Sequence, residues 1–190
     1  MRRTEIPDEI ISLEEARLFL RLDASGSPAT HPEDQLVQSL ITAAREAAEN
    51  YTQKALAYGE FVEILPGFPV VITLVAPTIS VTSIYYVDQD NVSQLLDPSE
   101  YEVVDNVIYP VTAWPATATG RATVTVTFQA GYTDLISPND YPMPVAIRQA
   151  MLLMIGHMYE NRESVCSAEK YEVPMGAHYL MTPYRTGMGL

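Results

Sequence analysis

The spacing of apolar residues changes along the 190-residue chain from a helical period to a strand period and back again. Before residue 60 the apolar positions recur every three or four residues, which is typical of amphipathic helices. Short segments of strand character follow, and after residue 134 a long apolar run predicts another helix. The pattern therefore predicts an α+β fold in which an antiparallel β-rich insertion interrupts a helical body.

Two helices are predicted before residue 60. Ser12-Leu13-Glu14-Glu15 has the spacing of a capping box, and a short helix to about Leu22 should follow it. A second helix should open at residues 32–34, where proline and acids occupy the first turn. Its predicted apolar stripe consists of Leu36, Val37, Leu40, Ile41, Ala44, Ala47, Ala48 and Tyr51. Polar residues, Arg45 among them, are expected mostly on the other side.

Short strands are predicted through residues 60–133, and turn residues separate them. The candidate strands are residues 61–65, 70–75, 79–87, 101–104, 107–109 and 121–128. Asp105-Asn106 is a candidate for a tight hairpin turn. In the last strand the threonines should form one face, and Val124, Val126 and Phe128 the other. Strands this short and closely spaced favour an antiparallel sheet or a small sandwich.

The helix predicted from Val145 to Tyr159 is apolar nearly all round, which indicates burial on most sides. Pro142 and Pro144 fall in its expected first turn, and Asp140 offers a capping oxygen. The run is shorter than the roughly 20 apolar residues of a membrane span. We therefore expect a core helix that the rest of the chain covers.

The last segment of the chain combines helix breakers with apolar side chains. We interpret it as an extended C-terminal tail that docks on its own domain or on a neighbour. The predicted organisation has four parts: an N-terminal helical part of the body (1–59), a β-rich insertion (60–133), a long core helix that completes the body (134–165) and the extended tail (166–190).

The net charge of −13 argues against a protein that grips phosphates, because that affinity comes from clustered Lys and Arg. An acidic surface is compatible with a passage through which DNA slides without sticking. Cys166 is the single cysteine, so no internal disulfide is possible and a reducing compartment is expected. The N-terminus has no apolar segment of a signal peptide, so we expect a soluble protein that is intracellular at synthesis.

The sequence contains no recognisable catalytic, metal-binding or cofactor-binding motif. His31, His157 and His178 are scattered and lack the spacing of a zinc site. We interpret His157 as a core or interface histidine rather than a ligand or base. Nucleophile elbows and Gly-rich phosphate loops are also missing from the sequence. Trp114 lies on a predicted loop, where it is either an interface anchor or a plug for the end of the sheet.

Seven segments occur in an order that is more specific than any one of them. They are L-E-E-A-R-L-F-L-R-L-D (13–23), P-E-D-Q-L-V-Q-S-L-I-T-A-A-R-E-A-A-E-N-Y-T (32–52), P-G-F-P (66–69), A-P-T-I-S-V-T-S-I-Y-Y-V-D (76–88), W-P (114–115) leading to V-T-V-T-F-Q-A-G-Y (124–132), P-V-A-I-R-Q-A-M-L-L-M-I-G-H-M-Y-E-N-R-E (144–163) and V-P-M-G-A-H-Y-L-M-T-P-Y-R (173–185). Together they resemble the head–tail connector (adaptor, or head completion) proteins of tailed bacteriophages. The resemblance covers nearly the whole chain except residues 1–11.

The resemblance implies a structural virion protein and not an enzyme. Copies would form a ring, twelvefold, under the portal, where the ring extends the DNA channel and provides the surface for tail attachment. The implied partners are the portal protein, other copies of the chain, and stopper or tail proteins. Genomic DNA would pass through the lumen without specific binding, and neither a membrane nor a cofactor is implied. The implied location is the virion neck, after synthesis in the host cytoplasm.

The resemblance also assigns the C-terminal tail to the portal. The assignment agrees with the way extended segments bind, since they cover much surface through a few apolar anchors. The expected contact residues are Tyr179, Leu180, Met181, Tyr184 and Arg185. The β-rich insertion is expected to contact other subunits or the tail. Two alternatives stay open at this point. One is another neck part, such as a stopper or tail terminator, and the other is an unrecognised small-molecule enzyme, which would need a pocket with converging polar groups.

Overall fold

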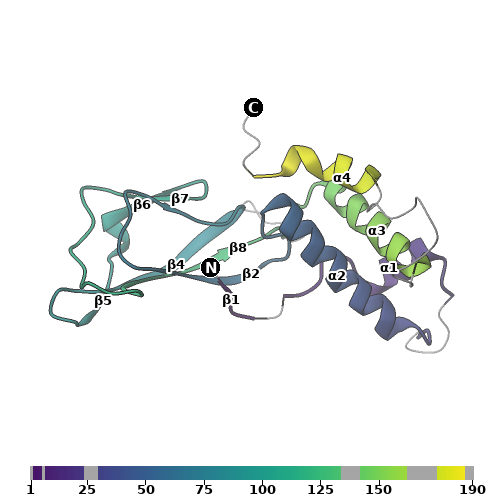
Figure 1. Cartoon of the computed structure of the whole chain (residues 1–190), viewed down its shortest axis with the longest axis horizontal. Helices are drawn as coiled ribbons and strands as arrows, with labels where there is room; N and C mark the ends of the chain where they lie inside the picture. The colour runs from purple at the N-terminus through teal and green to yellow at the C-terminus, as the bar shows by residue number, and fades with distance from the viewer. Residues whose placement is uncertain (1, 6, 24–29, 134–141, 162–174, 187–190) are drawn as a thin grey trace. The chain divides into compact units, whose positions relative to one another are not determined.

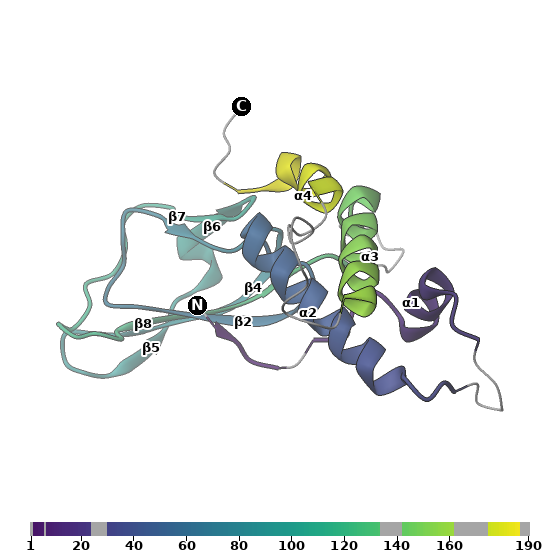
Figure 2. The same cartoon turned by 45° about the vertical axis from the view of Figure 1, so that its right-hand side comes forward.

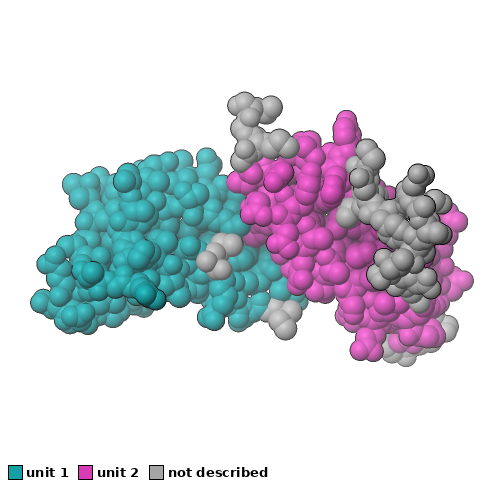
Figure 3. All heavy atoms as spheres, in the orientation of Figure 1, with its two compact units in different colours: residues 1–8, 57–141 teal, residues 9–56, 142–190 magenta. Residues whose placement is uncertain are grey.

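A computed structural model of the chain describes residues 2–5, 7–23, 30–133, 142–161 and 175–186. Helices and antiparallel strands are both present and lie in separate parts of the chain, which confirms the α+β class (Figure 1). The chain forms two compact units, which Figure 3 colours separately. Unit 1 contains residues 1–8 and 57–141, and unit 2 contains residues 9–56 and 142–190.

Unit 1 holds the strands that the structure describes, arranged in two antiparallel sheets. The five-stranded sheet has the order β1-β2-β8-β4-β5, with the bounds β1 (Arg2–Arg3), β2 (Gly59–Leu65), β4 (Thr78–Val87), β5 (Ser93–Leu95) and β8 (Val124–Ala130). The three-stranded sheet has the order β3-β7-β6, with the bounds β3 (Ile72–Thr73), β6 (Tyr101–Val104) and β7 (Val107–Pro110). A short 3-10 turn, η1 (Pro98–Glu100), connects the two sheets along the chain.

Strand β8 lies at the centre of the larger sheet, and its side chains alternate between the two faces. Val124, Val126 and Phe128 are fully buried, while the threonines between them are half-buried on the other face, as the sequence predicts. The ring of Phe128 stacks on Phe61 of β2 at 5.8 Å between centroids. Period-two alternation therefore gives this sheet one core face and one outer face.

Residues with positive φ lie at two strand ends in unit 1. Asp105 has a positive φ of 53° between β6 and β7, which confirms the predicted hairpin at Asp105-Asn106. Gly131 ends β8 with a φ of 115°, and a Cβ built on it would lie 2.4 Å from the Ala57 carbonyl oxygen. Only glycine accepts both that conformation and that approach.

Unit 2 is helical, and its helices pack on one another (Figures 1 and 2). The elements are α1 (Leu13–Leu20), α2 (Asp34–Thr52), α3 (Val145–Glu160), α4 (Met175–Met181) and the 3-10 turn η2 (Thr182–Tyr184). Helix α3 is the core of the unit, with Ile147, Ala150, Met151 and Ile155 fully buried. This confirms the prediction of a long buried C-terminal helix. Among the described helices, none is long and apolar enough to cross a bilayer.

Helices α1 and α3 are joined by an ion pair that the capping-box motif did not predict. Ser12 caps α1 by accepting a hydrogen bond from the Glu15 backbone N–H at 3.1 Å. The Glu15 carboxylate instead accepts two hydrogen bonds from Arg148 of α3, at 2.9 and 2.7 Å. This pairing explains why a charged residue interrupts the apolar run of the core helix.

The stripe predicted for α2 needs two corrections. Ala47, which the periodicity placed on the apolar stripe, is exposed, and Arg45, which it placed on the polar side, is 4% exposed. Arg45 is buried because Glu9 and Glu49 pair with its guanidinium, at 3.0 and 2.8 Å. The spacing of apolar residues along α2 could not have predicted the pairing with Glu9, because Glu9 lies in a distant part of the sequence.

Several element boundaries also differ from the predictions. The strand predicted at residues 70–75 is reduced to β3, and β1 and β5 were not predicted. Strand β1 places the start of the chain in the sheet unit rather than in the helical part predicted for residues 1–59. Pro144 occupies the N-cap position of α3, without a side-chain hydrogen bond, and the expected cap Asp140 lies outside the described residues. Within the segment predicted as an extended tail, residues 175–184 form α4 and η2.

Candidate assembly surface

Helix α4 and the turn after it are docked on the end of α2, and Tyr51 is the centre of this contact. The Tyr51 ring stacks on His178 at 4.6 Å between centroids, and its hydroxyl lies 2.9 Å from the Thr182 hydroxyl. The Arg185 guanidinium lies 5.6 Å above the same ring. The Thr186 backbone N–H donates to the Thr52 carbonyl oxygen at 2.9 Å. Tyr51 thus contacts both α4, through His178, and the residues that follow it, Thr182 and Arg185.

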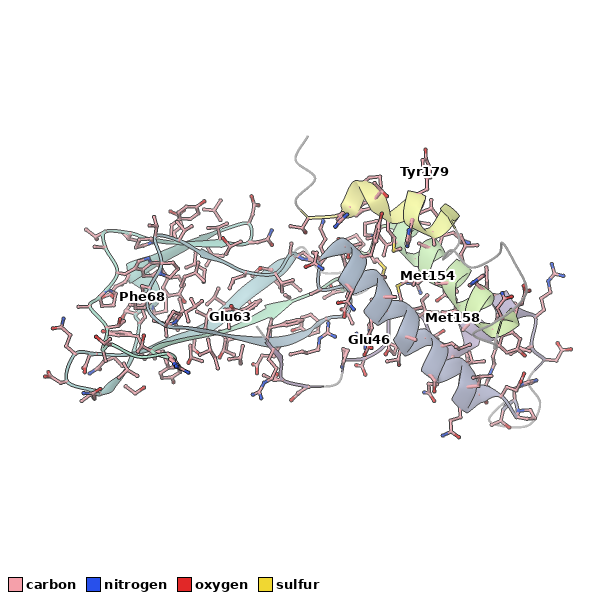
Figure 4. The ribbon with its side chains drawn as sticks, viewed as in Figure 1. Glu46, Glu63, Phe68, Met154, Met158 and Tyr179 are labelled. Carbon is pink, nitrogen blue, oxygen red and sulfur yellow. The ribbon has the colours of Figure 1, made fainter. Side chains whose placement is uncertain are left out.

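The inner face of α4 is part of the core of unit 2. Ala177 and Met181 are 0% and 1% exposed. Helix α4 packs on α3, and a Cβ on Gly176 would lie 4.0 Å from the Leu153 side chain of α3, an ordinary van der Waals distance. On the opposite face of α4, Tyr179 is 80% exposed and projects away from the ribbon (Figure 4).

The five residues expected to contact the portal therefore fall into different environments. Tyr179 and Arg185 are exposed, and Leu180 and Tyr184 are half-buried. Met181 is buried within its own unit because it packs on the inner face of α4. It is therefore not available to a partner while α4 stays docked.

Trp114 packs inside unit 1 on a small aromatic cluster. Its ring is stacked on Phe68, with 4.7 Å between centroids and 6° between planes, and Phe68 in turn contacts Tyr86 of β4. The indole N–H donates to the Val70 carbonyl oxygen at 3.2 Å. Trp114 is half-buried, and these contacts hold its ring against unit 1.

The described residues offer little for catalysis or metal binding. No group of three or more His, Cys, Asp or Glu residues in the described part of the chain could hold a metal ion. His157 is half-buried near the end of α3, where its ring nitrogen lies 3.4 Å from the Asn161 amide nitrogen. A hollow of about 420 Å³ in unit 1 is lined by Glu5, Pro7, Asp8, Tyr58, Gly59, Glu60 and Gln129. Those side chains include no nucleophile–base pair.

Charged groups in unit 2 are arranged to stabilise its fold. The Arg17 guanidinium, together with the backbone N–H of His31, holds the pKa of Asp34 below its usual value of 3.8. Burial by itself would lower the pKa of Arg45, but hydrogen bonding to Glu9 and the charge of Glu49 outweigh it, and the pKa is raised. Tyr159 of α3 also donates a hydrogen bond to Glu33 at the start of α2. The Arg17–Asp34 pair connects α1 with α2, and the Tyr159–Glu33 pair connects α3 with the start of α2. Arg45 is instead paired within α2, to Glu49, and with Glu9, which precedes α1.

Sequence reasoning missed the role of Tyr51. The helical period placed it on the apolar stripe of α2, which is consistent with its half-buried position. Its partners His178 and Thr182 lie more than 120 residues away in the sequence, so no local pattern could have paired them.

Comparisons with known proteins agree on the kind of protein. The family model described as "Phage gp6-like head-tail connector protein" matches residues 10–109. A chain in the neck of an empty GTA particle, computed with C6 symmetry, is 25% identical, with a TM-score of 0.77 and coverage of 100% of this chain and 96% of that chain. A chain in the virion of a native gene transfer agent (GTA) particle is also 25% identical, with a TM-score of 0.74 and the same coverage.

A third solved chain extends the likeness in fold. It comes from the neck of a native GTA particle computed with C12 symmetry, and is 24% identical, with a TM-score of 0.74 and coverage of 100% of this chain and 98% of that chain. A comparison with curated proteins gives no match. Because the family model covers more than half of the sequence, the chain belongs to the phage gp6-like head–tail connector family.

Proposed function

We propose that this chain is a structural subunit of a virion neck, where copies of it form a closed ring beneath the portal. The observation that carries the proposal is the family match, together with the full-length likeness to a chain in a particle neck. The ring would extend the DNA channel and provide the surface on which a stopper or tail protein attaches. The C6 and C12 symmetries of the similar necks support a ring, and twelve copies is the number we propose.

Helix α4 is the proposed portal-binding element, with Tyr179 as its main anchor. Tyrosine combines a large apolar ring with a polar tip, which is why it is enriched among binding hot spots. Its ring is exposed although the inner face of the same helix is buried. Leu180, Tyr184 and Arg185 flank it and complete the proposed contact.

Substitution of Tyr179 tests this element better than removal of the tail does. A deletion of residues 171–190 would take Ala177 and Met181 out of the core of unit 2, so it would test folding as much as binding. Tyr179→Ala should weaken binding of the purified portal protein about tenfold. The matched control is Leu18→Ala, on a side chain that is 81% exposed on α1. Equal affinity of Tyr179→Ala and the unaltered chain would contradict the α4 assignment.

Disruption of the gene in its source phage tests the function as a whole. We expect DNA-filled or leaking heads without tails, together with separately assembled free tails, in electron micrographs. Normal infectious virions would overturn the proposal, because a connector is needed for every particle.

The alternatives are less well supported. A stopper or tail terminator would also lie in the neck, and a ring seated directly on the portal separates the connector from both. For an enzyme, the hollow in unit 1 would need a reactive pair among its lining residues, and its described lining has none. The family match favours the structural role over both alternatives.

A further inference from the structure

The outer face of the five-stranded sheet carries a row of side chains across four strands, and all of them except a threonine of β8 are apolar or aromatic. Ile64 of β2 is opposite Thr125 of β8, Thr125 is opposite Tyr85 of β4, and Tyr85 is opposite Leu95 of β5. Ile64, Tyr85 and Leu95 are 53%, 46% and 58% exposed. Neighbouring strands lie roughly 4.8 Å apart, so this outer row spans about 14 Å. The alternation that buries Val126 places these residues on the solvent side.

The outer face of the three-stranded sheet also carries exposed apolar side chains. Val104 of β6 is opposite Val107 of β7, which is opposite Thr73 of β3, and Tyr109 follows on the same face of β7. Val104 and Tyr109 are 47% and 42% exposed. The other face of the same sheet holds Ile72 and Ile108, which are 2% and 0% exposed. Each sheet of unit 1 thus has a buried inner face and an outer face with exposed apolar side chains.

The two outer faces belong to different sheets of one compact unit. In both views of the ribbon, β6 and β7 lie on one side of unit 1 and β2, β8 and β5 on the other (Figures 1 and 2). Exposed charges of opposite sign lie one residue pair away from the two rows. Arg2 is opposite Val62 on the face of Ile64, and Glu102 is opposite Tyr109 on the face of Val104.

A closed ring of identical subunits needs two different interacting surfaces on each subunit. Each subunit in such a ring contacts its two neighbours through two different surfaces, which must complement each other. Scattered apolar side chains on a surface need no explanation, but rows on two sides of one unit with opposite flanking charges match the requirement. We propose that the outer face of the large sheet docks against the outer face of the small sheet of the next copy. This inference rests on the proposed ring.

Cross-linking within assembled necks tests the docking. In a background with Cys166→Ser, the pair Leu95→Cys and Val104→Cys places one thiol on each face. A second pair, Ile64→Cys and Tyr109→Cys, covers the other ends of the two rows. A short bis-maleimide added to purified particles should convert each double variant into a ladder of covalent multimers. The four single variants should remain monomers, because the two faces that meet are different.

Any other cross-linking result would overturn the inference, and the four possible results can be told apart. No ladder from either pair, in necks that contain the chain, would remove the docking and leave the connector function intact. Dimers from a single variant would show that a face meets its own copy. Cross-links to a protein of different mass would assign the face to a tail or stopper protein. Particles whose necks lack the chain would overturn the proposed function and the docking with it.

Charge reversal supplies a second test that needs no added thiol. Arg2→Glu and Glu102→Arg should each lower the yield of assembled necks at least several-fold, because each brings like charges together. The double variant Arg2→Glu with Glu102→Arg should restore most of the yield. A double variant that assembles no better than either single variant would show that the two charges do not face each other.

Discussion

Arg45 is a buried cation whose charge is balanced by carboxylates from two parts of unit 2. Glu9 and Glu49 are both less than a quarter exposed, while Glu46, 3.7 Å away, is 63% exposed. Glu49 also accepts a hydrogen bond from the Leu56 backbone N–H at 3.0 Å. The network thus ties both Glu9 and Leu56 to the middle of α2.

Arg45→Met should therefore destabilise unit 2 by about 2 kcal/mol, because it leaves two partly buried carboxylates without their cation. Denaturant unfolding followed by the helical circular dichroism signal measures the change. Glu46→Gln is the matched control, and should change the free energy of unfolding by less than about 0.5 kcal/mol since its pair is exposed. A similar effect of both substitutions would contradict the buried network.

Asp34 should make the stability of unit 2 depend on pH in the acid range. It accepts hydrogen bonds from the Arg17 side chain and the His31 backbone N–H, and its pKa is lowered in the folded chain. A lowered pKa contributes stability above the unfolded value of about 3.8, and this contribution is lost as the pH falls through the folded value.

Asp34→Asn should accordingly melt at a lower temperature than the unaltered chain at pH 7. The gap between the two melting temperatures should narrow once the pH falls below about 4, where the carboxylate of the unfolded chain is protonated. Thermal scans across that range measure the gap. A gap that stays constant with pH would show that the carboxylate charge is not the source of the stabilisation.

At the scale of elements, the end of β8 depends on a glycine. Gly131→Ala should destabilise unit 1 by about 3 kcal/mol, because the new Cβ meets the Ala57 backbone and the φ of 115° suits only glycine. Trp114 is the single tryptophan and lies in unit 1, so its fluorescence follows this unfolding.

Gly67→Ala is the matched control for that measurement. The nearest atom to its added Cβ would be the Thr117 hydroxyl oxygen at 3.6 Å, an ordinary van der Waals contact. We expect a change within about 0.5 kcal/mol. A large loss at Gly67, or none at Gly131, would contradict the geometry of the strand end.

At the scale of the whole molecule, the net charge of −13 should keep the chain from retaining DNA. Proteins that bind duplex DNA without specificity do so at roughly 10⁻⁴ to 10⁻⁶ M at physiological salt. This chain should bind more weakly than that range in an electrophoretic mobility assay with duplex DNA. Micromolar retention would contradict a channel through which the genome slides freely.

The sequence by itself determined the kinds of element and most of their order. Period-two alternation fixed the two faces of β8, and the apolar run of α3 fixed its burial, because both depend on side chains near one another in the chain. The cap at Ser12 and the turn at Asp105 were predictable for the same reason. The ordered motifs also led to the family.

Only the tertiary structure decided which distant groups meet. Arg45 is buried because Glu9 forms an ion pair with it. The Glu15 carboxylate pairs with Arg148 instead of capping its own helix. Helix α4 forms within a tail that is rich in helix breakers, because docking on Tyr51 and α3 stabilises a segment too short to be helical alone. The apolar rows on the two sheets likewise require strand register, which follows from pairing between segments that are far apart in the sequence.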